Sequence, residues 1–160
     1  MGAGVLFFAV FNHQTYFLLG KENSCNKWSD FGGTNNPNET HFNCAVRECY
    51  EETHGIFGCL DDYKQKIKRN FVTNIIKKNK NYNTFLVKID YDYNLPNYYN
   101  NNYNFLKSQN SNLGKLEGLM EKKEIKWFTL EELTKSKNII RPFYWEIIQK
   151  LIDNFHTYKH

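Results

Sequence analysis

A group of acidic side chains between residues 33 and 55 offers the clearest chemistry in the sequence. Three glutamates, Glu48, Glu51 and Glu52, are spaced at i, i+3 and i+4, which places them on one face of a helix. Carboxylates packed in this way repel one another, by about a few tenths of a kcal/mol per exposed pair. A divalent cation such as Mg²⁺ or Mn²⁺ between them would remove the repulsion, and both ions bind oxygen ligands. The alternative is a solvated acidic face on an amphipathic helix.

Two neighbouring features favour a metal site over an acidic surface. The glycine pair Gly32-Gly33 precedes the helix, and Arg47 stands next to Glu48, where its guanidinium can hold a carboxylate through paired hydrogen bonds. Metal ions in such a site neutralise phosphate oxygens and acidify bound water, and a carboxylate accepts the proton. The chemistry indicated is therefore that of a divalent cation shared between carboxylates and phosphate oxygens.

The element that must carry these glutamates is a helix predicted over Glu39–Thr53, ended by Gly55 in a left-handed conformation. Its apolar face collects Phe42, Ala45, Val46, Cys49 and Thr53. The turn-forming residues of 28–38 predict a loop before it. Buried or half-buried strands are predicted at Val5–Val10, Tyr16–Leu19, Phe71–Ile76, Thr84–Ile89 and Ile125–Phe128.

Further elements are predicted towards the C-terminus. Leu130–Leu133 is expected to form a short helical turn, and Pro142 suits the first turn of a last helix that runs to about Phe155. Between these elements and the earlier strands, the Asn-rich stretch of about 94–112 is interpreted as an insertion that is partly loop.

Composition predicts one globular domain over residues 1–160. The net charge of +4 suits a polyanionic ligand but is too small to indicate nucleic acid by itself. The longest apolar run, Gly4–Phe11, is too short to span a bilayer, so no membrane partner is expected. The four cysteines lack zinc-site spacing, and no secretory segment precedes them. We therefore expect a reducing cytoplasm, that of the host if the gene is viral, and leave the oligomeric state open.

The whole segment resembles the Nudix box, which reads G, five residues, E, seven residues, then R-E-U-x-E-E-x-G-U with U a bulky apolar residue. Gly33, Glu39 and the run Arg47-Glu48-Cys49-Tyr50-Glu51-Glu52 match it at the same spacing, a specific signal. Where the pattern has its last glycine, this chain has His54, followed by Gly55. Either one residue is inserted, or His54 itself takes the left-handed conformation.

The resemblance implies an α/β fold, an α/β/α sandwich with a mixed β-sheet between helices. It also implies a hydrolase that cleaves a diphosphate linkage in a nucleoside diphosphate derivative with Mg²⁺ or Mn²⁺. Glu51 and Glu52 would bind metal with the backbone carbonyl of Gly32, and Glu48, held by Arg47, would bind metal or activate water. Glu52 and Arg47 thus count as catalytic with Glu48, while Gly33 and Glu39 would shape the box.

One more carboxylate from outside the box is expected to join the site. Glu121 is the first candidate and Glu124 the second, because both lie just before the predicted strand with Trp127, and Glu117 is a weaker third. Each could equally be surface charge.

Several alternatives to a small nucleotide substrate remain. Lysines between Lys64 and Lys80, among them Lys77 and Lys78, could hold RNA, and Trp28 could stack on a base. This would favour mRNA decapping or hydrolysis of 5′-polyphosphate RNA, although such a run is as often a solvated hairpin. A diphosphoinositol polyphosphate is a further candidate, and ADP-ribose ranks lower because no proline follows the box by about fifteen residues. The non-enzymatic alternative is an inactive nucleotide- or RNA-binding Nudix module.

Overall fold

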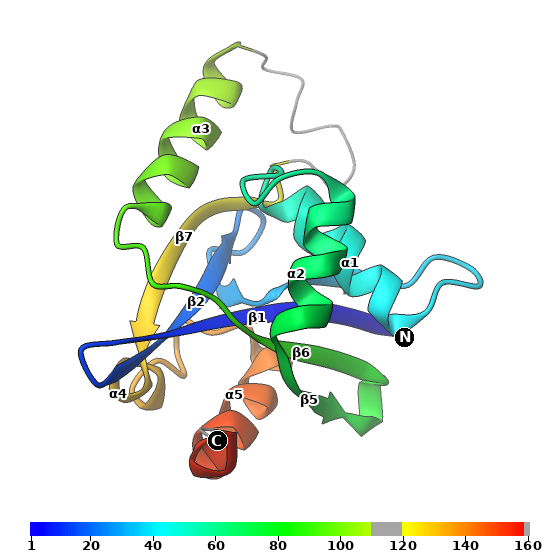
Figure 1. Cartoon of the computed structure of the whole chain (residues 1–160), viewed down its shortest axis with the longest axis vertical. Coiled ribbons are helices and arrows are strands. Elements are labelled where there is room, and N and C mark those ends of the chain that lie inside the picture. Colours follow the sequence, from blue (N-terminus) through cyan, green and yellow to red (C-terminus); the bar gives the residue numbers. More distant parts are fainter. Residues whose placement is uncertain (110–119, 159–160) are drawn as a thin grey trace.

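The computed structural model of the chain describes residues 1–109 and 120–158, which form a seven-stranded mixed sheet between helices (Figure 1). The strand order is β3-β2-β1-β6-β5, with β4 paired to β1 and β7 paired to β2. Strands β1 and β6 are parallel, and the other described pairs are antiparallel. The strands are β1 Gly2–Phe11, β2 Gln14–Glu22, β3 Trp28–Ser29, β4 Phe31–Thr34, β5 Phe71–Lys77, β6 Tyr82–Lys88 and β7 Lys122–Thr129. The predicted α/β sandwich with a mixed sheet is confirmed.

The alternation of side chains along β1 divides the core into two layers. Ala3, Val5 and Phe7 face one cluster, which contains the buried sides of α1 (His41–Glu52) and α2 (Leu60–Asn70). Leu6 and Phe8 face a second cluster beneath α5 (Pro142–Asn154). Figure 1 shows α1 and α2 on one side of the sheet and α5 on the other. Strand β1 is buried on both faces, which explains its continuous apolar sequence.

Helix α1, which carries the glutamates, has well-defined ends. Thr40 caps its start by accepting a hydrogen bond from the backbone N–H of Asn43 at 3.2 Å. At the other end His54 and Gly55 both have positive φ, at 53° and 66°. His54 therefore takes the left-handed conformation, the second of the two alternatives for the irregular end of the box.

Two segments differ from the sequence interpretation because tertiary contacts are not visible in local composition. Residues 28–38 were expected to form a loop, but β3 and β4 lie within them, where glycines allow β4 to pack closely against β1. Residues 60–70, which hold the first lysines of the basic run, form α2 and not a hairpin. Its Tyr63 and Ile67 are buried one turn apart, and acidic and basic residues occupy its first and last turns.

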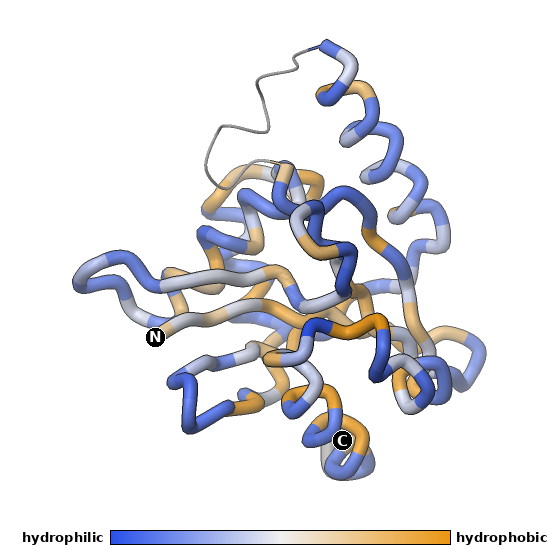
Figure 2. The backbone as a smooth tube through the Cα atoms, turned by 180° about the vertical axis from the view of Figure 1, so that it is seen from behind, coloured by the Kyte–Doolittle hydropathy of each residue, from blue (hydrophilic) through white to orange (hydrophobic). Residues whose placement is uncertain are grey.

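The Asn-rich stretch is also more ordered than expected. Residues Leu95–Gln109 form α3, a helix whose Leu95, Tyr99 and Tyr103 are buried at intervals of four residues. Figure 2 shows α3 as a mostly hydrophilic helix, whereas hydrophobic residues gather in the central strands. The three buried side chains pack on the same core as α1, so Leu95–Gln109 is a helix within the segment that was described as partly loop. Residues 110–112 lie outside the described residues.

The remaining elements agree with the sequence. The predicted pair 71–76 and 84–89 appears as antiparallel β5 and β6, joined by a 3₁₀ turn at Lys78–Lys80. Helix α4 spans Leu130–Thr134, and a 3₁₀ turn at Phe155–Tyr158 follows α5. Within residues 1–109 and 120–158, none of the helices combines the length and apolar character needed to cross a membrane.

The fold separates the four cysteines into two classes. Cys25 and Cys59 are exposed, whereas Cys44 and Cys49 are buried in α1. Burial raises the pKa of the Cys44 thiol to about 11 and that of Cys49 well above its usual range. Because the thiolate is the reactive form, both stay inert at pH 8.

We expect a thiol reagent such as 5,5′-dithiobis(2-nitrobenzoic acid) to react quickly with two of the four cysteines of the native protein at pH 8. Absorbance of the released product measures this count, and unfolding in guanidinium should expose all four. Loss of one fast thiol in each of Cys25→Ser and Cys59→Ser identifies the two sites. Three or four fast thiols in the native protein would contradict the burial of α1.

Candidate active site

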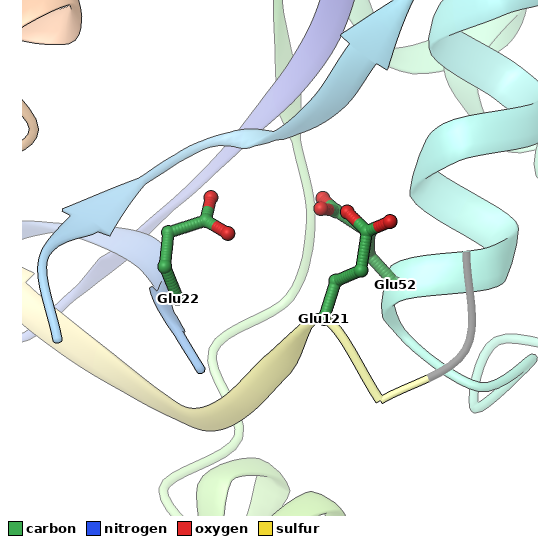
Figure 3. A group of neighbouring side chains, drawn as sticks. All are labelled: Glu22, Glu52 and Glu121. Carbon is green, nitrogen blue, oxygen red and sulfur yellow. The ribbon is translucent and has the colours of Figure 1, made fainter. Parts of the chain in front are cut away.

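Three carboxylates from different elements meet at the C-terminal end of α1. Glu52 ends α1, Glu22 ends β2, and Glu121 directly precedes β7 (Figure 3). One carboxylate oxygen from each lies within 4.8 Å of the other two. Glu22 and Glu52 are buried and Glu121 is exposed, so the group has an internal side and a side open to solvent. The first candidate outside the box, Glu121, is thus brought to the box glutamate Glu52.

Glu52 is fixed at both of its oxygens. Its Oε2 accepts a hydrogen bond from the backbone N–H of Gly32 at 2.7 Å, and its Oε1 lies 3.5 Å from Lys122 Nζ. Burial raises the pKa of the Glu52 carboxyl well above its usual range, while the charge of Lys122 acts in the opposite direction. The negative charge on Glu52 is therefore poorly compensated, which is the condition that a bound cation would relieve.

Arg47 organises the other carboxylates of the box. Its Nε and Nη2 each donate to Glu39 at 2.9 Å, in a bidentate pair. Its Nη1 donates to Glu48 at 2.8 Å and to Glu51 at 3.3 Å. Hydrogen bonding to Arg47 lowers the pKa of Glu39, whereas burial raises the pKa of Glu48 despite its Arg47 contact. The arginine thus connects the loop-bracing Glu39 to the two glutamates that face the cavity.

The two glycines bring the backbone against these side chains. A Cβ on Gly33 would lie 2.5 Å from the carboxyl carbon of Glu48, so a side chain at this position would displace that glutamate. A Cβ on Gly32 would collide with the backbone of β1. The preceding Asp30, buried and with a pKa raised to about 6 by burial, accepts hydrogen bonds from the hydroxyls of Tyr82 and Thr84. These contacts hold the β3–β4 corner that presents the Gly32 N–H to Glu52.

A buried lysine lies inside the acidic group and was not anticipated from the sequence. Lys122 is fully buried; its Nζ contacts Glu22 Oε1, Ser29 Oγ at 2.8 Å and Glu52. Burial lowers its pKa, but the charges of Glu52 and Glu22 outweigh this effect and the pKa of Lys122 is raised overall. The ammonium group is therefore charged and neutralises part of the group.

Glu22 was also missed, although the strand pattern contains a signal for it. Tyr16 and Leu18 face the α1 side of the sheet, and Glu22 follows at the same parity, so its carboxylate points inward. A register shift in the β2–β7 pairing at Lys21/Glu22 sets Glu22 opposite Lys122. A carboxylate at an inward strand position is a stronger sign of function than one on a helix surface.

Helix α3 holds this end of the site from outside. The Tyr99 hydroxyl lies 2.9 Å from the carbonyl oxygen of Glu52 and 2.6 Å from that of Lys122, and its single hydrogen is shared between these two acceptors. The His54 ring stacks on Tyr99, with ring centroids 4.9 Å apart. The irregular end of the box is thus packed against the Asn-rich helix.

The box residues and Glu121 share one open cavity of about 530 Å³. That volume suits a ligand of nucleotide size, since small-molecule pockets measure roughly 300–1,000 Å³. Its lining residues are Gly32, Gly33, Thr34, Asn36, Arg47, Glu48, Glu51, Glu121 and Arg141.

Other residues predicted for the site lie elsewhere. Trp28 is buried and packs edge-on against Phe128, with ring centroids 5.0 Å apart. Lys77 is buried and its Nζ pairs with Glu146 of α5 at 2.7 Å, while the neighbouring Lys78 lies in the exposed turn between β5 and β6. None of the three lines the cavity in the described part of the chain.

Of the other two carboxylate candidates, Glu124 pairs with Lys21 at 3.4 Å and does not line the cavity. Glu117 lies outside the described residues.

The donor set of this site fits a hard divalent cation. Among the described side chains that line the cavity or belong to the buried acidic group, five are carboxylates and three are cations. The carboxylates are Glu22, Glu48, Glu51, Glu52 and Glu121, and the cations are Arg47, Lys122 and Arg141. Because the carboxylates outnumber the cationic side chains, the site offers negatively charged oxygen ligands of the kind that Mg²⁺ and Mn²⁺ prefer.

Comparison with protein families agrees with this geometry. The model of the NUDIX domain matches residues 2–151, so the chain belongs to this family. The predicted family is confirmed, and with it the predicted enzyme class, a hydrolase acting on phosphoric anhydrides. No curated protein matches the chain.

Solved structures share the fold at low sequence identity. A Caenorhabditis elegans Ap4A hydrolase, crystallised as a binary complex, is 15% identical with a TM-score of 0.57, covering 98% of this chain and 99% of that one. The Francisella tularensis bifunctional NMN adenylyltransferase/ADP ribose pyrophosphatase, complexed with AMP and a Mn ion, is 13% identical with a TM-score of 0.58, covering 95% and 41%. The NUDIX domain of Shewanella oneidensis NrtR, complexed with ADP ribose, is 10% identical with a TM-score of 0.53, covering 96% and 86%.

Proposed function

We propose that this protein is a Mg²⁺- or Mn²⁺-dependent hydrolase that cleaves a diphosphate linkage in a nucleotide derivative. The observation that carries the proposal is the position of Glu121, which lines the nucleotide-sized cavity with Glu48 and Glu51 and also meets the buried Glu52. Glu48, Glu51, Glu52 and Glu121 would hold the cation. When bound, it supplies neutralisation of phosphate oxygens and acidification of water.

The side chains of the site would accept the proton of the attacking water and keep the carboxylates in position. Glu48 is held by Arg47 and has a raised pKa, which suits it to accept the proton of the attacking water. The water oxygen forms a bond to one phosphorus atom as the bond from that phosphorus to the bridging oxygen breaks. The second phosphate group leaves with that oxygen. Glu52, fixed by the Gly32 N–H, keeps its orientation through this step.

The substrate class follows from the size and charge of the site. A nucleoside diphosphate joined to another group fills a cavity of about 530 Å³ and presents the phosphates to the carboxylate-bound cation. The fold relatives bound to or named for Ap4A and ADP ribose make these two compounds the first to test, followed by nucleoside triphosphates. Diphosphoinositol polyphosphates and capped or 5′-polyphosphate RNA complete the series. RNA ranks lower, because the basic run is divided between α2, the β5–β6 turn and the buried Lys77.

We expect hydrolysis of at least one of these compounds with Mg²⁺ or Mn²⁺, and no hydrolysis in excess EDTA. Separation of the products by ion-exchange chromatography measures both. Returning the metal to the chelated enzyme should restore the rate, which controls for damage by the chelator. Turnover that persists in EDTA would rule out the metal mechanism, and tight nucleotide binding without turnover would favour an inactive binding module.

A further inference from the structure

Arg141 reaches the cavity from the segment before α5, and its backbone is rigidly placed. Its N–H donates to the carbonyl of Trp28 at 2.9 Å, and the Trp28 N–H donates to the carbonyl of Ile139 at 2.9 Å. Strand β3 thus ties residues 139–141 to the sheet, so Trp28 fixes Arg141 in place and does not itself face the cavity.

The guanidinium of Arg141 is also held in one direction. Its Nη1 donates to Glu22 Oε1 at 3.0 Å, and its central carbon lies 5.0 Å from the centre of the Phe143 ring. The side chain is 38% exposed and lines the cavity with Glu48, Glu51 and Glu121. In the described part of the chain its Nε and Nη2 have no protein acceptor.

Arg47, the other arginine of the cavity, has no free donor nitrogen. All three nitrogens of Arg47 are bonded, to Glu39, Glu48 and Glu51 and also to the carbonyl of Thr34. Lys122 is fully buried and does not line the cavity. Among the cationic side chains that the structure describes at the site, Arg141 therefore has donors left for a ligand.

We infer that Arg141 binds a phosphate group of the substrate, through the donors that its pairing with Glu22 leaves free. A guanidinium fork matches two phosphate oxygens, and its ring and ion-pair contacts fix its direction before substrate arrives. The inference rests on the proposed function, because it assigns to Arg141 the binding of the diphosphate whose hydrolysis the carboxylates of α1 would catalyse. Arg141 would contact substrate equally before and during the reaction, so it affects binding more than the chemical step.

The test is Arg141→Gln, assayed with the substrate that the wild-type enzyme hydrolyses best. We expect KM to rise about 10- to 100-fold with kcat changed much less, the pattern of lost uniform binding. Calorimetric titration with ADP in the presence of Mg²⁺ should show a similar loss of affinity. The KM and ADP affinity of Arg141→Lys should lie between those of the wild type and of Arg141→Gln, because the lysine keeps the charge but loses the two-pronged guanidinium. The matched control is Arg69→Gln, on the exposed side of α2 and away from the cavity, which should leave both quantities unchanged.

Two results would overturn the inference. If KM and ADP affinity stay at wild-type values in Arg141→Gln, Arg141 does not contact phosphate, while the proposed hydrolase stands. Electron paramagnetic resonance of free Mn²⁺ measures the affinity of Arg141→Gln for the metal without nucleotide. If this affinity falls while KM and ADP affinity do not change, Arg141 acts only on Glu22. A wild-type protein that hydrolyses nothing yet binds ADP through Arg141 would support the inference and refute the proposed function.

Discussion

Replacing Glu52 with glutamine is expected to lower kcat by about 10²- to 10³-fold, the usual effect of removing one electrostatic group at a catalytic centre. Glutamine keeps the size of the side chain and an oxygen that accepts the Gly32 N–H, and it removes the charge that a cation needs. The fold should survive for a reason that the sequence did not show. Glu52 is buried with a raised pKa, so a neutral side chain relieves the burial of a charge.

Steady-state kinetics and circular dichroism on the same preparation measure the two parts of this prediction. Glu131→Gln is the matched control, since Glu131 is 75% exposed in α4 and pairs only with Lys135 in the described structure. It should keep wild-type kcat. Near wild-type turnover in Glu52→Gln would show that the metal site lies elsewhere, and an unfolded variant would assign Glu52 a structural role.

Replacing Lys122 with methionine should destabilise the metal-free protein by about 3–5 kcal/mol, because it leaves the buried Glu52 without a cation and Glu22 with Arg141 alone. For a chain of this size such a loss lowers Tm by roughly 10 °C. Mg²⁺ or Mn²⁺ should raise the Tm of this variant more than that of the wild type, since a divalent cation neutralises the same carboxylates. Thermal denaturation with and without metal measures both shifts.

Lys135→Met provides the control, because it removes the lysine of an exposed i,i+4 pair with Glu131. Its effect on Tm should be much smaller than that of Lys122→Met and should not depend on metal. An equal, small effect for both lysines would mean that Lys122 does not neutralise the site. A large loss at Lys122 that metal does not reduce would place the cation away from Glu22 and Glu52.

The box could be predicted because its information is local. Gly33, Glu39 and the glutamates of α1 lie within one loop and one helix, and helical geometry alone places the glutamates together. Their burial could not be predicted in the same way. The glutamates were placed on a different face from the apolar side, but Glu48 and Glu52 are buried, because β4 packs against both and Lys122 of β7 contacts Glu52.

The other half of the site depends on contacts between distant residues. Lys122 is 100 residues from its partner Glu22, and Arg141 is 119 residues from it. Taken alone, each is an ordinary charged residue, and only the pairing of β2 with β7 and of β3 with residue 140 brings them together. Sequence order identified Glu121 because it precedes a recognisable strand.

Helix α3 was underestimated for a different physical reason. Asparagine is a poor helix former because its side chain competes for backbone hydrogen bonds, so an Asn-rich stretch predicts loop. Burial of Leu95, Tyr99 and Tyr103 on one face outweighs that preference. Composition was averaged over the whole segment, whereas the three buried positions decide its structure.

The distance in sequence between the two halves of the site has a consequence for the newly made protein. Translation releases α1 and its box early, but β1 must wait for β6, and β2 for β7, before the sheet can close. Glu121, Lys122 and Arg141 leave the ribosome only after α1, α2 and α3 have all been synthesised. A nascent chain that has not yet reached β7 therefore carries the entire box without the residues that complete the site.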